Sequence, residues 1–121
     1  MILVDSSVWI AHLRLGLADL SERLSAGAVL GHPMVIGELA VGNLPQRSLI
    51  LDSLRDLPQA TAATDEEVLS FIERHRLFGI GIGYVDAHLL ASTRLSSDTR
   101  LWTLDRRLSD AASRLGLAME V

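Results

Sequence analysis

The chain has 121 residues, which suits a single domain, and it carries 15 acidic residues, 11 cationic residues and no cysteine. The lack of cysteine excludes disulfides, thiolate chemistry and cysteine-ligated zinc. All 11 cations are arginine, so lysine-dependent functions such as P-loop nucleotide hydrolysis are excluded too. No apolar run is long enough to span a membrane and no basic leader precedes the first apolar residues, so we expect a cytoplasmic protein with no membrane association.

Short apolar runs alternate with helix patterns along the whole chain. Strands are predicted at 2–4, 28–30 and 101–104, with a weak strand at 59–63 and a final edge strand at 118–121. Helices are predicted at 8–13, 18–26, 33–41, 45–57, 64–77, 84–95 and 106–115. This order predicts one domain over 1–121, an α/β fold built as a three-layer α/β/α sandwich with a mostly parallel sheet of about five strands.

Four acids occupy positions that ordinary surface charge does not explain. Asp5 and Asp105 each follow a predicted strand, so both are expected at the carboxyl edge of the sheet, where ligands bind in open α/β folds. Glu38 and Asp86 have apolar helical neighbours, which predicts that their carboxylates point inward. Because burying an unpaired carboxylate is costly, each must find an arginine or a cation must collect them.

Structural roles account for part of this pattern. Asp5 and Asp105 are acceptable helix N-caps, Asp86 suits a first helical turn, and a buried Glu–Arg pair would explain Glu38. If all four carboxylates converge, however, they require a compensating charge, and an all-oxygen site favours Mg²⁺ or Mn²⁺ over zinc. Removing these four acids from the 15 leaves 11, equal to the 11 arginines, so the net charge of −4 still permits contact with a phosphate backbone.

Four segments of the chain resemble, in order and spacing, the PIN-domain ribonucleases, and in particular the VapC-type toxins of bacterial toxin–antitoxin pairs. They are 2–10 (ILVDSSVWI), 35–39 (VIGEL), 81–91 (GIGYVDAHLLA) and 101–108 (LWTLDRRL). The resemblance spans nearly the whole chain. One departure is Ser6, where such toxins more often carry threonine, and both residues keep a hydroxyl.

The resemblance implies a site and an activity. Asp5, Glu38, Asp86 and Asp105 match the family's acidic quartet, which binds Mg²⁺ or Mn²⁺, and Asp5 and Asp86 match its most direct ligands. Two polar residues would support the site, Ser7 and Thr103. The implied activity is hydrolysis of RNA by metal-activated water, leaving a 5′-phosphate and a 3′-hydroxyl, in a toxin that inhibits translation. The implied partners are an RNA substrate, a VapB-type antitoxin that occludes the site, and a second copy of the chain in a homodimer.

The histidines offer a rival mechanism, a metal-independent ribonuclease that uses the ribose 2′-OH. The residues concerned are His12, His32, His75 and His88. Asp86 and His88 are two positions apart and do not share a helix face, and solvated or hydrogen-bonded structural histidines explain the same pattern. A non-catalytic PIN-like scaffold that binds RNA or a protein is the third possibility.

Two pairs of arginines are candidate phosphate contacts, because guanidinium groups suit bidentate phosphate binding. They are Arg74 with Arg76 and Arg106 with Arg107. Ordinary helix-surface charge is the simpler explanation of both pairs. The glycines at 79, 81 and 83 follow a helix and lack dinucleotide-loop spacing, so no nucleotide cofactor is expected.

Overall fold

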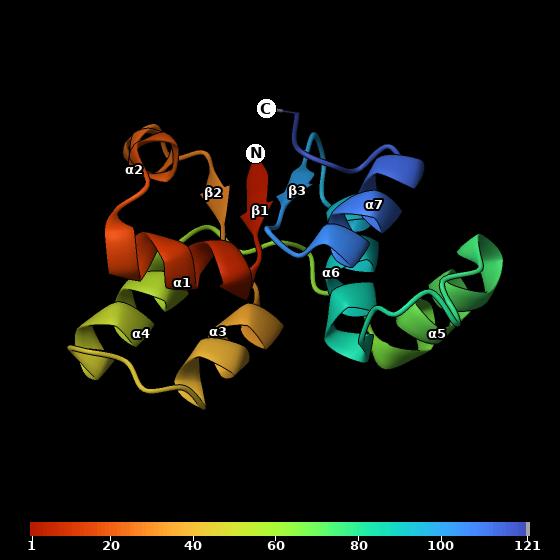
Figure 1. The fold of residues 1–121 in the computed structure, drawn as a ribbon, viewed down its shortest axis with the longest axis horizontal. Coiled ribbons are helices and arrows are strands. Elements are labelled where there is room, and N and C mark those ends of the chain that lie inside the picture. Colours follow the sequence, from red (N-terminus) through yellow and green to blue (C-terminus); the bar gives the residue numbers. More distant parts are fainter. Residues whose placement is uncertain (121) are drawn as a thin grey trace.

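The structure is a computed structural model that describes residues 1–120, in which seven helices surround a small sheet (Figure 1). The strands are β1 (Ile2–Val4), β2 (Val29–Leu30) and β3 (Arg100–Trp102). The helices are α1 (Ser6–Leu15), α2 (Ala18–Ser25), α3 (Pro33–Ala40), α4 (Arg47–Asp56), α5 (Asp65–His75), α6 (Tyr84–Leu95) and α7 (Arg106–Arg114).

The sheet is parallel throughout, with the order β2-β1-β3. Leu3 of the central strand is in register with Leu30 on one side and Leu101 on the other. Parallel strands end at the same edge of a sheet, so the residues that follow β1 and β3 are brought together. In Figure 1, α1–α4 lie to one side of β1 and α5–α7 to the other. The predicted α/β class and parallel sheet are therefore confirmed.

The described residues form three strands, not the predicted five. Each predicted outer strand is reduced to one isolated parallel bridge, Gly31 with Gln59 beyond β2 and Leu101 with Ala118 beyond β3. Beyond β2, the backbone N–H groups of Thr61 and Ala63 donate to serine hydroxyls of α6 and its C-cap. They are therefore not available to extend the sheet. At the other edge the predicted strand ends at Val121, which lies outside the described residues.

The core is built from aliphatic side chains contributed by the sheet and by most of the helices. The largest fully buried apolar residues are Leu3, Val4, Val8, Leu20, Val29, Val35, Val68, Leu89, Leu90, Leu101 and Leu108. Helix α6 crosses this core with a continuous buried run from Ala87 to Thr93. None of the helices in residues 1–120 is both long and apolar enough to cross a membrane.

Candidate active site

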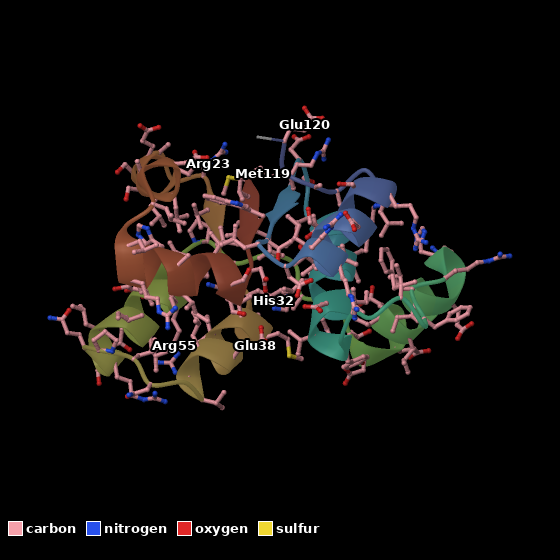
Figure 2. The ribbon with its side chains drawn as sticks, in the orientation of Figure 1. Arg23, His32, Glu38, Arg55, Met119 and Glu120 are labelled. Carbon is pink, nitrogen blue, oxygen red and sulfur yellow. The ribbon has the colours of Figure 1, made fainter. Side chains whose placement is uncertain are left out.

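The four acids singled out by the sequence come from separate elements and meet at the carboxyl edge of the sheet. Asp5 directly follows β1, Asp105 is the N-cap of α7 after β3, Glu38 lies on α3, and Asp86 lies in the first turn of α6. Figure 2 shows the Glu38 side chain on the side of α3 that faces α6. Residues up to 100 positions apart in the chain therefore share one edge of the molecule.

The charges of these acids act on one another. Partial burial raises the pKa of Glu38, a hydrogen bond from Ser6 opposes this, and the charges of Asp5 and Asp86 raise it further. Burial also raises the pKa of Asp86, opposed by the Gly83 backbone N–H and reinforced by the charges of Asp5 and Asp105. Repulsion of this kind acts between carboxylates that lie near one another.

Asp5 is the most firmly held of the four, and only 5% of its surface is exposed. The hydroxyls of Ser7 and Thr103 each donate a 2.7 Å hydrogen bond to its Oδ2. The same hydroxyls accept backbone N–H groups from Leu104 and Asp105, each at 3.0 Å. The two predicted supporting residues thus orient Asp5 and tie it to the loop that leads to Asp105.

Ser6 contacts the candidate site, although the sequence analysis did not place it there. Its hydroxyl lies 3.1 Å from Glu38 Oε1 and 3.5 Å from Asp5 Oδ1, so it bridges two of the four acids and its proton serves the nearer oxygen of Glu38. The available signal was its position beside Asp5. Because serine keeps the hydroxyl, its replacement of the more usual threonine leaves this bridge intact.

Each of the four carboxylates uses one oxygen for structure. Asp5 Oδ2 accepts the two hydroxyls, Glu38 Oε1 accepts Ser6, Asp86 Oδ2 accepts the Gly83 N–H at 3.0 Å, and Asp105 Oδ1 accepts the Leu108 N–H at 2.9 Å. Among residues 1–120, the opposite oxygen of each carboxylate receives at most the 3.5 Å contact from Ser6 to Asp5 Oδ1. The site thus presents four oxygens that are oriented but still available.

These oxygens are not closed around a common point. Within residues 1–120, no three histidine, aspartate or glutamate side chains lie close enough to form a ready metal-binding group. Nor does any ion pair in that range involve the four acids, so the arginine partner considered for Glu38 is not found there. The arrangement is an open acidic site, and no arginine in the described part of the chain forms an ion pair with its carboxylates.

The expectation that Glu38 and Asp86 point into a buried face needs correction. Glu38 is exposed and Asp86 is partly exposed, and Asp105 is exposed as well. The inward face of α3 is formed instead by Val35 and Leu39, each 2% exposed. Glu38 lies at the margin of that face, so it borders the open edge of the sheet and a solvent-borne ion or substrate can reach it.

His32 is a structural histidine. It is 1% exposed, its Nδ1 accepts the Met34 N–H at 3.0 Å, and its Nε2 lies 2.9 Å from Ser92 Oγ. Because Nδ1 accepts, the ring proton sits on Nε2 and is donated to Ser92. Burial, with a smaller effect from His88, lowers the pKa of His32 to about 4. This residue caps α3 and ties it to α6.

The other histidines are also engaged with the fold. His12 Nδ1 accepts the Leu17 N–H at 2.9 Å, and the His75 ring packs on an aromatic neighbour, Phe71, with ring centroids 4.4 Å apart. His88 is 2% exposed and its Nε2 lies 2.9 Å from Asp65 Oδ1. These contacts give every histidine a structural role and favour none as a catalytic pair.

The two predicted arginine pairs have different surroundings. Arg106 and Arg107 lie in the first turn of α7, directly after Asp105, and the Arg107 side chain covers Gly81 in the loop that leads into α6. Arg74 instead lines a cavity of about 400 Å³ between α5 and α6, and Arg76 is the C-cap of α5. The structure therefore brings only the α7 pair beside an acid of the site.

A second cavity, of about 310 Å³, opens beside Glu38. It is lined mainly by apolar groups from α1, α3 and the segment that follows α3, including Ile10, Leu13, Leu39 and Leu44. Ile10 and Leu13 are 45% and 36% exposed. An apolar surface thus adjoins the acidic site.

Comparison with known proteins identifies the family. No family model matches the chain. The chain is 49% identical over 119 residues to Ribonuclease VapC32 of Mycobacterium tuberculosis, in the strains CDC 1551 / Oshkosh and ATCC 25618 / H37Rv. The alignment covers 98% of this chain and 96% of each relative. With this identity over almost its whole length, and with the four acidic motifs at one edge of its sheet, the chain belongs to the VapC-type toxin ribonucleases.

Proposed function

We propose that the chain is an endoribonuclease that depends on Mg²⁺ or Mn²⁺ and uses Asp5, Glu38, Asp86 and Asp105 as its metal-binding and catalytic residues. The observation that carries the proposal is the set of four carboxylates, each with one oxygen anchored by the protein and the other available. The ribonuclease name of the relatives supports the reaction class.

The donor set fits a hard divalent cation. All four candidate ligands are carboxylate oxygens, which suit Mg²⁺ or Mn²⁺, and no neutralising arginine competes for them in residues 1–120. When bound, the cation would supply a more acidic water and would stabilise negative charge on the scissile phosphate. It would also relieve the repulsion among the acids, which adds to the effect of burial in raising the pKa values of Glu38 and Asp86.

The chain's own residues have defined tasks in this proposal. Ser7 and Thr103 hold Asp5 through its Oδ2 and leave its Oδ1 available, and Ser6 holds Glu38 through its Oε1. The Gly83 N–H orients Asp86 in the same way. Fixing ligands through neighbouring groups is what gives a metal site its affinity and rate.

The reaction is tested by incubating RNA with the protein in Mg²⁺, Mn²⁺ or EDTA. We expect cleavage only with a metal, 5′-phosphate products, and loss of cleavage in Asp5→Asn and Asp86→Asn with an unchanged fold. Asp52→Asn is the control, since Asp52 forms an exposed ion pair on α4. A 2′,3′-cyclic phosphate formed in EDTA would instead favour the histidine mechanism. Absence of Mn²⁺ binding by calorimetry would favour a non-catalytic scaffold.

Substrate phosphates are proposed to bind Arg106 and Arg107 next to Asp105, with Arg74 and Arg76 as more distant contacts. A phosphate contact contributes to the salt dependence of binding. Replacing Arg107 with glutamine should weaken RNA binding and reduce the slope of log K against log salt by about one. Arg55→Gln, at an exposed ion pair on α4, should leave the slope unchanged.

We also propose the biological setting implied by the family, a cytoplasmic toxin that inhibits translation and is held inactive by a VapB-type antitoxin. The apolar cavity beside Glu38 suits an antitoxin segment that would cover the acids. Leu13→Glu should then abolish rescue by the antitoxin while toxicity persists.

Sequencing the 5′-phosphate ends released after induction would identify the RNA. Analytical sedimentation would measure whether the chain forms the proposed homodimer.

A further inference from the structure

Tyr84 is an exposed aromatic residue that is nevertheless held in one position. It is the first residue of α6, two positions before Asp86, and 44% of it is exposed. Its hydroxyl donates a 2.6 Å hydrogen bond to Asp65 Oδ1 at the start of α5. The same interaction raises the pKa of Tyr84 and lowers that of Asp65, as expected when a phenol donates to a carboxylate.

The imidazole of His88 packs against the Tyr84 ring. The two rings meet edge to face, with centroids 4.8 Å apart and planes at 88°. His88 is itself fixed, because it is 2% exposed and its Nε2 lies 2.9 Å from the same Asp65 oxygen. Tyr84 is thus held by two contacts, with Asp65 at its hydroxyl and with His88 at its ring, while 44% of its surface remains exposed.

A surface ring fixed in this way favours a ligand that stacks on it, because little side-chain freedom is left to be lost on binding. Unpaired RNA bases stack on exposed aromatic side chains, which is the usual way in which proteins hold single-stranded RNA. Tyr84 lies in the first turn of α6, as Asp86 does, so such a base would bind near the end of α6 that carries Asp86. Residues two apart on a helix face different directions, so the base would belong to a nucleotide that flanks the scissile phosphate.

We propose that the Tyr84 ring is a stacking platform for an unpaired base of the RNA substrate, held in place by Asp65 and His88. This inference rests on the proposed ribonuclease function and adds to it a residue that selects single-stranded substrate. Stacking is tolerant of base identity, so Tyr84 would favour unpaired RNA without specifying its sequence.

The test is a binding measurement in an Asp5→Asn background, so that the RNA is not cut. A fluorescently labelled single-stranded RNA is titrated with proteins carrying Tyr84, Tyr84→Phe, Tyr84→Trp or Tyr84→Leu. The phenylalanine and tryptophan variants keep an aromatic ring but lose the hydrogen bond to Asp65, so we expect them to bind slightly more weakly than Tyr84, by no more than about twofold. We expect the leucine variant, which has no ring, to bind about fivefold more weakly or worse. Leu69→Ala, at a residue of α5 that is 58% exposed, is the matched control and should bind like Tyr84.

Two further measurements separate stacking from other roles. An RNA in which single nucleotides are replaced by abasic ribose should lose affinity for the Tyr84 protein at one position and lose none there for Tyr84→Leu. The slope of log K against log salt should be equal for the Tyr84 protein and for Tyr84→Leu, because the substitution removes no phosphate contact. Tyr84→Asp is not informative, since added charge would change that slope.

Several outcomes would overturn the proposal. Equal binding by Tyr84→Leu would do so, and so would equal losses in the leucine and phenylalanine variants, which would assign Tyr84 only the hydrogen bond to Asp65. A changed oligomeric state in Tyr84→Leu would assign the ring to a protein interface instead. Because binding is measured without cleavage, a failure of the metal-dependent reaction would be seen separately in the Asp5 and Asp86 variants.

Discussion

Thr103 donates its hydroxyl proton to Asp5 across 98 positions of the chain, in a 2.7 Å hydrogen bond that joins the ends of β1 and β3. The Thr103 oxygen also accepts the Asp105 N–H. One side chain therefore orients one acid of the site and fixes the backbone of another. The geometry of the site depends on this contact as much as on the acids themselves.

Removing that hydroxyl should damage the site more than the fold. Thr103→Val keeps the shape but leaves Asp5 Oδ2 with Ser7 alone, and we expect activity to fall by about 10- to 100-fold. The free energy of unfolding should fall by about 1–2 kcal/mol. Thr103→Ser, which retains the hydroxyl, is the control for both kinetics and urea unfolding. Equal activity in the valine and serine variants would contradict the proposed role.

Neutralising the acids should stabilise the metal-free protein. The pKa values of Glu38 and Asp86 are raised above their ordinary 4.5 and 3.8, so the folded state holds protons more tightly than the unfolded one. Stability is therefore lost as pH rises through this range, and at neutral pH the full penalty is present. Glu38→Gln and Asp86→Asn should melt at a higher temperature than the unaltered protein in EDTA. Mn²⁺ should raise the Tm of the unaltered protein and have a smaller effect on these variants.

His32 should make the protein sensitive to mild acid. Its folded pKa of about 4 lies below the ordinary 6.5, so the unfolded chain binds a proton first as pH falls. The contribution of His32 to the free energy of unfolding is fully present above pH 6.5. It decreases as the pH falls toward 4, by about 3 kcal/mol in total. Urea unfolding at several pH values should show a flatter profile for His32→Asn, which keeps a helix-capping acceptor. Parallel profiles in this window would exclude His32 as the cause.

Gly81 should tolerate no side chain. Its φ is +85°, and a Cβ there would lie 2.8 Å from Arg107 Cδ. We expect Gly81→Ala to cost roughly 1–2 kcal/mol of stability from the backbone alone and to lower activity by disturbing the loop that leads into α6, the helix of Asp86. Adding Arg107→Ala should recover the steric part of the stability loss. Gly37→Ala is the opposite case, since a Cβ there meets nothing within 4 Å and helix α3 should gain stability.

The site was more predictable from sequence than the limits of the sheet. Asp5 and Asp105 follow short apolar strands, and parallel pairing places the ends of such strands together whatever lies between them. The predicted strand at 59–63 failed because Thr61 and Ala63 donate to Ser96 and Ser92. These partners are 35 and 29 positions away, and no local pattern reports them.

The positions of individual side chains were harder to predict from the sequence than the strands and helices. The periodicity of α3 placed Glu38 near an apolar face but did not show that it lies at the open margin of that face. The bridge from Ser6 to Glu38 depends on how α1 and α3 pack, and the cover of Arg107 over Gly81 depends on α7. Positions that depend on how elements pack together cannot be obtained from the spacing of residues within one element.

The central place of β1 in the sheet has a consequence for synthesis of the protein. Asp5 leaves the ribosome nearly a hundred residues before Thr103, although β1 and β3 are neighbours in the folded sheet. Contacts of such long range form late, after most of the chain is available. A polypeptide that ends before Thr103 would therefore have Asp5 oriented by Ser7 alone, and the candidate site is completed only once β3 and the residue after it have been made.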